Sequence, residues 1–183
     1  MKNLFMESGF ASMNKQGETL CGDYYTAART RESTTLVLSD GLGSGVKANI
    51  LSTLSSTILT TLMASRRLSM AECVQTVAET LPMCSERHLA YSTFTIFQFD
   101  HLRGGAYLAQ FDNPLAILLR DGRSLPYEIT RKIIGGKEID ESAFTLQVGD
   151  MLVFFTDGVT SSGLGKTMPD GWLREDVIRY LEQ

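Results

Sequence analysis

Two short apolar runs in the chain end in the same way, with an aspartate followed by a glycine. Residues 34–39 are β-branched and apolar and precede Asp40-Gly41, and residues 151–156 precede Asp157-Gly158. Short runs of this composition favour β-strands. The pattern therefore predicts two strands, far apart in the sequence, that each carry a carboxylate at the tip.

Between these runs the apolar spacing changes to that of helices. From 47 to about 65 apolar side chains recur every fourth residue, which predicts a helix with a mostly buried stripe. A second helix is expected from Ser69, where a capping box begins, to Leu81-Pro82, and a third over 171–181. The expected apolar faces are Ile50, Leu54, Ile58 and Leu62, flanked by Leu51, Leu59 and Met63; then Cys73, Val74 and Val77; then Leu173, Val177 and Leu181.

The remaining chain consists of short alternating or apolar segments separated by turn residues. The expected strands are 4–13, 19–26, 34–39, 92–99, 106–111, 115–119, 126–134, 143–148 and 151–156. Strands, two helices, a meander of strands and a last helix do not alternate as in a parallel α/β protein. We therefore expect an α+β fold of antiparallel sheets with segregated helices, in one domain over residues 1–183.

Charge and cysteine content exclude several classes of function. The formal net charge is −4, so there is no basic surplus to attract nucleic acid. The longest apolar-looking segment, 50–64, is interrupted by seven serines or threonines, and the N-terminus has no signal-peptide pattern. Cys21, Cys73 and Cys84 are odd in number and show no paired spacing, which is typical of reduced thiols. We expect a cytoplasmic protein that binds neither nucleic acid nor membrane.

The glycine-rich turn after Asp40 is not a nucleotide-binding loop. In a dinucleotide fingerprint a third glycine would stand where this chain has Val46. In a Walker loop a lysine is followed by serine or threonine, whereas Lys47 is followed by Ala48. Both nucleotide interpretations therefore fail at a defining position.

Three carboxylates each stand next to a glycine: Asp23, Asp40 and Asp157. A charged carboxylate at the end of a buried strand is costly unless a partner compensates it. Mg²⁺ and Mn²⁺ prefer carboxylate, carbonyl and water oxygens, and two such ions can activate water and hold a phosphoryl group. The alternative, that each Asp-Gly is only a turn, has about even weight on spacing alone. Asp121-Gly122 and Asp170-Gly171 are examples of plain turns.

Four motifs together resemble one family. They are Gly22-Asp23, the stretch Asp40-Gly41-Leu42-Gly43-Ser44-Gly45 with Ala48, Ser92-Thr93-Phe94-Thr95, and Phe155-Thr156-Asp157-Gly158-Val159. Their order is similar to that of the SpoIIE-like serine phosphatases of the metal-dependent type 2C protein phosphatase superfamily. The resemblance implies an αββα sandwich with two Mn²⁺ or Mg²⁺ ions. It also implies hydrolysis of phosphoserine or phosphothreonine on a protein by metal-activated water, in bacterial signalling.

The resemblance also implies a role for individual residues. Asp40 would bridge both ions and Gly41 would lend its carbonyl to one of them. Asp23 would hold the second ion, directly or through water, and Asp157 the first. The catalytic residues are then Asp40 and Asp157, whereas no residue indicates a substrate-binding position. The family's commonest substrates are phosphorylated anti-anti-sigma factors, but nothing in the sequence selects that partner.

One departure from the family pattern leaves two other interpretations open. The family has a further strand with a fourth metal-binding aspartate, and after Asp157 the chain offers only Asp170 and Asp176, neither in that context. The resemblance thus implies a domain that lacks its last strand, with a weakened metal site. The alternatives are a non-catalytic scaffold or sensor of the same fold, and a metal-binding regulatory module of a longer protein.

Overall fold

A computed structural model describes residues 4–64, 70–80, 83–84, 89–90 and 92–183 of the chain. The strands are β1 Asp23–Arg29, β2 Ser33–Asp40, β3 Met83–Cys84, β4 Leu89–Ala90, β5 Phe94–Asp100, β6 Gly105–Phe111, β7 Ile117–Arg120, β8 Arg123–Leu125, β9 Thr130–Ile134, β10 Lys137–Thr145 and β11 Met151–Val153. The helices are α1 Gly45–Ala64, α2 Met70–Thr80, α3 Asp157–Thr160 and α4 Arg174–Leu181.

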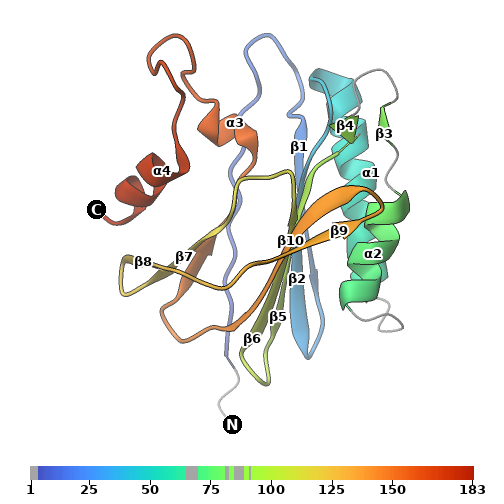
Figure 1. Cartoon of the computed structure of the whole chain (residues 1–183), viewed down its shortest axis with the longest axis vertical. Helices are drawn as coiled ribbons and strands as arrows, with labels where there is room; N and C mark the ends of the chain where they lie inside the picture. Colours follow the sequence, from blue (N-terminus) through green and yellow to red (C-terminus); the bar gives the residue numbers. More distant parts are fainter. Residues whose placement is uncertain (1–3, 65–69, 81–82, 85–88, 91) are drawn as a thin grey trace.

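Two antiparallel sheets form the centre of the molecule (Figure 1). The larger has the order β1-β2-β5-β6-β10-β9, and the smaller has the order β11-β7-β8. β3 and β4 make a separate two-stranded pair. Hairpin connections between sequential strands account for most of the pairing, as antiparallel sheets allow. The expected α+β class is confirmed.

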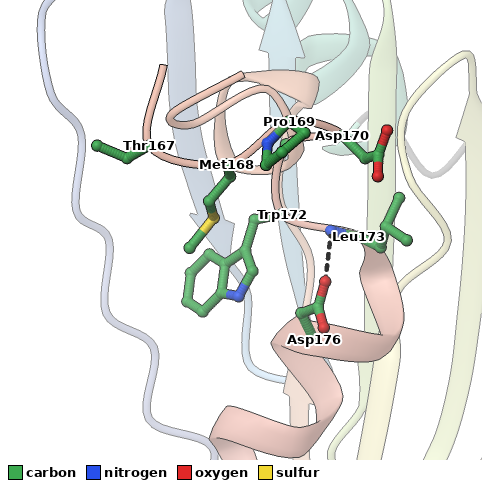
Figure 2. Close-up of a pocket in the computed structure, with 8 residues that line it drawn as sticks. Thr167, Met168, Pro169, Asp170, Trp172, Leu173 and Asp176 are labelled. Carbon is green, nitrogen blue, oxygen red and sulfur yellow. Dashed lines mark hydrogen bonds between the residues drawn. The ribbon is translucent and has the colours of Figure 1, made fainter. Parts of the chain in front are cut away.

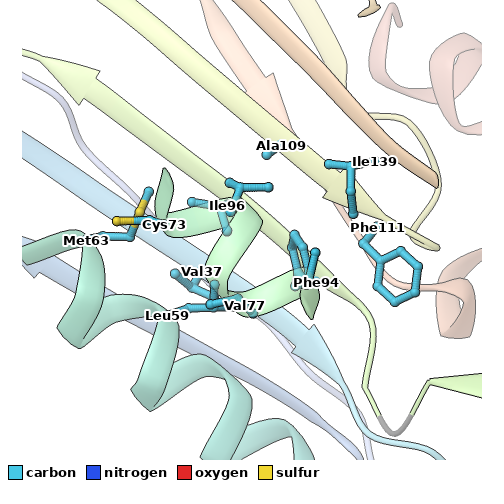
Figure 3. Packing of buried hydrophobic residues seen from close by; sticks show 12 residues of the cluster. Val37, Leu59, Met63, Cys73, Val77, Phe94, Ile96, Ala109, Phe111 and Ile139 are labelled. Carbon is cyan, nitrogen blue, oxygen red and sulfur yellow. The ribbon is translucent and has the colours of Figure 1, made fainter. Parts of the chain in front are cut away.

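Three apolar clusters define the layers. The first lies between helices α1 and α2 and one face of the larger sheet, where Leu59 and Val77 meet Val37, Phe94 and Ile96 (Figure 3). The second fills the space between the two sheets. The third lies between the smaller sheet and α4. The second cluster is centred on Leu36, Phe97, Phe99, Ala106, Leu108 and Ala116, and the third on Ile117, Leu119, Phe155 and Val177. Helices, sheet, sheet and helix therefore stack as an αββα sandwich.

Helix α1 is oriented differently from the expectation. Ile50 and Leu54 of the expected apolar stripe face outward, with exposed fractions of 59% and 56%, whereas Leu59 and Met63 are buried as expected. Between them and the start of the helix, the buried face carries small residues such as Ala48, Ser52 and Ser56. Ser52 donates a hydrogen bond to the carbonyl of Asn49 at 3.1 Å, and Ser56 to that of Tyr24 at 3.4 Å. Small side chains let the helix approach β1 and β2 closely, so the prediction of a buried Ile50 stripe was wrong.

Other boundaries also differ from the sequence-based expectation. Residues 4–13 form no strand, although the Leu4 amide donates to the His101 carbonyl at 3.3 Å. The strand expected over 143–148 begins earlier, at Lys137, because it pairs with both β6 and β9. The strand expected over 151–156 ends at Val153. The expected capping residue Ser69 and the helix end at Leu81-Pro82 lie outside the described residues.

Helix α2 agrees with the predicted pattern, because Cys73, Val74 and Val77 are buried as expected. Helix α4 agrees in part: Val177 is buried, but the helix begins at Arg174 and Leu173, before it, is 52% exposed. Within the described ranges, no helix combines the length and the apolar composition that a membrane span requires.

Candidate active site

Asp23 and Asp40 face each other across the pair of strands β1 and β2. Asp23 is the first residue of β1 and Asp40 the last of β2, and the antiparallel register makes them direct partners. The Gly41 amide continues the pairing with a 3.2 Å hydrogen bond to the carbonyl of Gly22. Residues directly opposite in such a ladder have neighbouring Cβ atoms. Strand pairing alone therefore brings together two carboxylates that are distant in the sequence.

Glycine is required at position 41 by the close approach of helix α1. A Cβ at Gly41 would overlap the backbone carbonyl of Ala48, so any side chain would displace the helix. Gly22 also lies close to helix α1 and to Asp40: a Cβ at Gly22 would lie 3.2 Å from the Ala48 Cβ and 3.5 Å from Asp40 Oδ1. The glycines next to both aspartates therefore let the strand tips and the start of α1 crowd together.

The backbone of Asp40 is fixed by the segment that precedes β5. The Ser92 hydroxyl and the Thr93 amide each donate to the Asp40 carbonyl at 2.9 Å. The Asp40 amide donates to the Thr93 hydroxyl at 3.3 Å, and that hydroxyl donates to Asn113 Oδ1 at 2.7 Å. Asn113 donates in turn to Thr95 at 3.0 Å. This network fixes the backbone at the tip of β2 through main-chain contacts of Asp40, so the carboxylate itself is not needed to hold the strand end.

Asp157 lies near Asp23 and Asp40 but belongs to the segment that follows the smaller sheet. The chain leaves β11, and Asp157 is the first residue of the short helix α3, which lies near the start of β1 (Figure 1). Its neighbour Thr156 donates a hydrogen bond to Asp23 Oδ2 at 3.1 Å. The two sheets are thus joined at the site itself. Asp157 lies in a helical turn and not at a strand tip, which corrects the sequence expectation.

The electrostatics show that the three carboxylates act on one another. Burial, followed by the negative charges of Asp23 and Asp157, raises the pKa of Asp40 to about 7. Burial also raises the pKa of Asp23, against the opposing effect of hydrogen bonds from Thr156 and Cys21. No lysine or arginine is among the causes of either shift. Asp23 and Asp40 are thus partly buried like charges that stand beside the exposed Asp157.

The donor set suits a divalent cation, because carboxylates that repel one another are stabilised by a shared positive ion. Across the ranges that the structure describes, however, no group of three or more His, Cys, Asp or Glu side chains converges to hold a metal ion. The carboxylates are neighbours, and rotations of their side chains would be needed to bring their oxygens onto a common ion.

The structure therefore brings together Asp23, Asp40, Gly41 and Asp157, which are all the site residues expected from the sequence. Sequence reasoning gave no role in the site to Thr156, which donates to Asp23, or to Asn113, which accepts from Thr93. The position of Thr156 directly before an Asp-Gly was the only available signal. The Asn113-Thr93 contact joins two turns that no local pattern connects.

A hollow of about 330 Å³ lies near the C-terminal helix and is separate from these carboxylates (Figure 2). Residues 167–173 and Asp176 line it, and the Leu173 amide donates to Asp176 at 3.1 Å. Gly171 adopts a φ of +73°, which confirms that Asp170-Gly171 is a turn. None of the candidate metal-binding residues contributes to this hollow.

Several solved structures have the same fold as this chain. The type 2C phosphatase domain, with a fragment of the regulatory domain, of the cell fate determinant SpoIIE from Bacillus subtilis matches with a TM-score of 0.73 and 19% identity, over 91% of this chain and 49% of that chain. The RsbU and RsbW domains of a Mycobacterium tuberculosis protein match with a TM-score of 0.63 and 21% identity, over 80% and 42%. RsbX in complex with magnesium matches with a TM-score of 0.62 and 19% identity, over 93% and 83%.

These likenesses establish the type 2C phosphatase fold. The chain spans about half the length of the first two structures, 49% and 42% respectively. No curated protein sequence gave a match. The sequence model of the family described as Stage II sporulation protein E (SpoIIE) matches residues 30–183. The chain belongs to the SpoIIE family, and the resemblance deduced from its motifs is confirmed.

Proposed function

We propose that this chain is a metal-dependent protein serine/threonine phosphatase whose site is the group Asp23, Asp40 and Asp157. The observation that carries the proposal is the closeness of these carboxylates in a partly buried place: burial, followed by the charges of Asp23 and Asp157, raises the pKa of Asp40 to about 7. A functional carboxylate group of this kind fits a fold whose members include serine phosphatases.

In this proposal Asp40 and Asp157 would hold one of two Mn²⁺ or Mg²⁺ ions, and Asp40 with Asp23 would hold the other. The Gly41 carbonyl would be an additional oxygen ligand. Bound ions would supply an activated water and positive charge for the phosphoryl oxygens. The chain itself contributes position: Ser92 and Thr93 fix the backbone of Asp40, and Thr156 orients Asp23. The magnesium complex of the fold relative RsbX supports the choice of a divalent cation.

We further propose a phosphorylated regulatory protein as the substrate, of the anti-anti-sigma type. The support is the similarity in fold to a protein that carries RsbU and RsbW domains and to a component of the bacterial stressosome. Cys21 and Cys73 are free thiols in the described structure, which supports a cytoplasmic setting.

The first experiment is hydrolysis of p-nitrophenyl phosphate by the 183-residue chain with Mn²⁺, with Mg²⁺, and with chelator alone. We expect activity that depends on the metal and is lost in Asp40→Asn. Asp170→Asn, which changes an exposed turn carboxylate, serves as the matched control and should retain activity. Hydrolysis that persists in chelator, or that is equal in both variants, would contradict the proposal.

A second candidate is a catalytically weak or inactive scaffold of the same fold. The observation in its favour is that, in the described part of the chain, no three potential ligand side chains converge on one point. This candidate predicts that Mn²⁺ neither binds tightly nor supports turnover. It also predicts that Asp40→Ala leaves the binding of a partner protein unchanged.

A further inference from the structure

The segment that precedes β1 holds one charged side chain against the rest of the fold. From residue 7 to residue 20 every residue is exposed except Glu18, which is half-buried. The turn that carries it is ordered by its own hydrogen bonds: the Glu18 amide donates to the Lys15 carbonyl at 2.9 Å, and the Asn14 side chain donates to the Thr19 carbonyl at 3.1 Å. The chain reaches Asp23 shortly afterwards. The turn therefore fixes a carboxylate just before a candidate metal-binding residue.

Glu18 lies against the glycine-rich turn that follows Asp40. The Ser44 hydroxyl donates a hydrogen bond to Glu18 Oε1 at 2.7 Å. A Cβ at Gly45 would overlap Glu18 Oε2, so the second carboxylate oxygen lies beside the first residue of α1. Gly45 has a φ of +61°, a conformation that residues with a side chain rarely adopt. Both oxygens of Glu18 thus contact the turn between Asp40 and α1.

The N-terminus of α1 favours a negative charge at this position. The first amide groups of a helix lack partners within the helix and carry a partial positive charge. Helix α1 has no acidic residue in its first turn, which contains Lys47 instead. Glu18 supplies the missing negative charge from another part of the chain. Its position is therefore set by both the hydrogen bond from Ser44 and the charge of the helix end.

A second contact joins the same two segments. The Asn49 side chain, in the first turns of α1, donates to the Cys21 carbonyl at 2.9 Å. Glu18 and Cys21 precede Asp23, whereas Ser44 and Asn49 follow Asp40. The two contacts therefore connect the segments that carry two of the candidate metal-binding aspartates.

The turn after Asp40 depends on contacts of this kind. Of residues 41–45, three are glycines, which have no side chain to anchor the backbone. Gly43 has a φ of +109°, and the Gly41 carbonyl is a candidate metal ligand in the same turn. Ser44 supplies a polar side chain, and its hydroxyl is used on Glu18.

We propose that Glu18 is a positioning residue for the metal site. Through Ser44 and Gly45 it holds the turn after Asp40 in the shape that a divalent cation at Asp40 and Gly41 requires. The inference rests on the proposed function, in which these groups bind Mn²⁺ or Mg²⁺.

The test is a calorimetric titration of the 183-residue chain and its variants with Mn²⁺. Glu18→Ala should weaken Mn²⁺ binding about 10-fold, the lower end of the range for residues that orient metal ligands, because solvent screens this exposed contact. Glu18→Gln, which keeps an oxygen acceptor for Ser44, should bind only about threefold more weakly than the parent chain. Glu7→Ala removes an exposed carboxylate of the same segment and is the control, with affinity equal to that of the parent.

A double-mutant cycle separates positioning through Ser44 from a general loss of stability. Ser44→Ala should weaken Mn²⁺ binding by a similar factor, and the double variant of Glu18→Ala and Ser44→Ala should bind no more weakly than Glu18→Ala alone. Hydrogen exchange in the metal-free chain gives a readout without the cation. Amides of residues 42–47 should exchange at least about fivefold faster in Glu18→Ala and at the parent rate in Glu7→Ala.

The outcomes distinguish this inference from the proposed function. A parent chain that binds no Mn²⁺ would overturn the proposed function and the role of Glu18 with it. A parent chain that binds Mn²⁺ while Glu18→Ala binds equally well would overturn the role of Glu18 alone. Full additivity of the two substitutions, unchanged exchange in the turn, or an equal loss in Glu7→Ala would also overturn that role and leave the proposed function standing.

Discussion

Asp150 and Asp40 are both carboxylates in the protein, but they stand in opposite environments. The Asp150 side chain is 1% exposed and receives two hydrogen bonds from Arg120, at 2.7 and 2.8 Å. That hydrogen bonding lowers the pKa of Asp150. Within the described residues Asp40 has no such partner, and its burial beside two other carboxylates raises its pKa to about 7.

The difference separates a structural carboxylate from a functional one. Asp150 caps the turn before β11 by accepting from the Gln147 amide at 2.8 Å, so its charge is used entirely within the fold. Asp40 is held through its backbone, and its carboxylate repels its neighbours. Such an arrangement weakens the fold locally, and it is expected where an outside cation completes the site.

The largest effect is expected for the catalytic role of Asp40. Asp40→Asn removes the ligand shared by both proposed ions, and we expect kcat/KM toward a phosphoserine peptide to fall at least about 100-fold. Asp150→Asn should leave the rate within about threefold, because Asp150 touches none of the three site carboxylates. Steady-state assays with Mn²⁺ measure both. A comparable loss in the two variants would remove the distinction between the two environments.

The next effect is on stability and concerns Asp150. Asp150→Asn leaves the Arg120 guanidinium without its partner and should cost about 1–2 kcal/mol in the free energy of unfolding, since Arg120 is 29% exposed and solvent screens the pair. Because the pKa of Asp150 is lowered in the folded state, its contribution is present above the ordinary carboxyl pKa. It is lost as pH falls through the lowered value. Urea denaturation at pH 7 and at pH 3 should show the difference shrinking on acidification.

The pH dependence of stability is expected to have the opposite sign for Asp40 in the metal-free protein. The raised pKa means that the folded state is favoured most while Asp40 is protonated, and that this benefit is lost as pH rises through about 7. Asp40→Asn should therefore be more stable than the parent chain by about 1 kcal/mol at pH 8, with partial solvent exposure limiting the gain. The gain should vanish near pH 4. A destabilised variant at pH 8 would show that Asp40 is a structural carboxylate like Asp150.

A smaller effect is expected at Thr156. Thr156→Val removes the hydroxyl that donates to Asp23 and keeps the shape of the side chain. We expect a loss of roughly 0.5–1 kcal/mol in stability and a decrease of Mn²⁺ affinity of up to about 10-fold. Thr156→Ser, which retains the donor, should restore most of the affinity. Unchanged affinity in the valine variant would mean that Thr156 does not position Asp23.

The site was more predictable from the sequence than the helix that covers it. Asp40 and Asp157 were found because each follows an apolar run and precedes a glycine, which is a pattern of neighbouring residues. Helix α1 was also found, and Leu59 and Met63 are buried as predicted, but Ile50 and Leu54 are exposed. Periodicity reports that apolar residues share a face; it does not report whether small residues on the other face allow closer packing against β1 and β2.

Contacts between segments that are distant in the sequence could not be predicted from local patterns. The strand expected over 143–148 has no local signal for its true start, because Lys137 is fixed by pairing and by the end of α2. Thr156 and Asn113 gain their roles only when β5, β6 and the segment after β11 meet. Their partners are chosen by tertiary packing, which a single sequence does not display.

The central claim is that Asp23, Asp40 and Asp157 form one cation site. Calorimetric titration with Mn²⁺ near pH 7, in buffers of different ionisation enthalpy, tests it most directly, because a cation must displace the proton that Asp40 holds at that pH. We predict saturable binding with release of about half a proton, declining toward none at pH 9, and loss of this release in Asp40→Asn. Binding without proton release, or equal binding by Asp40→Asn, would contradict the account.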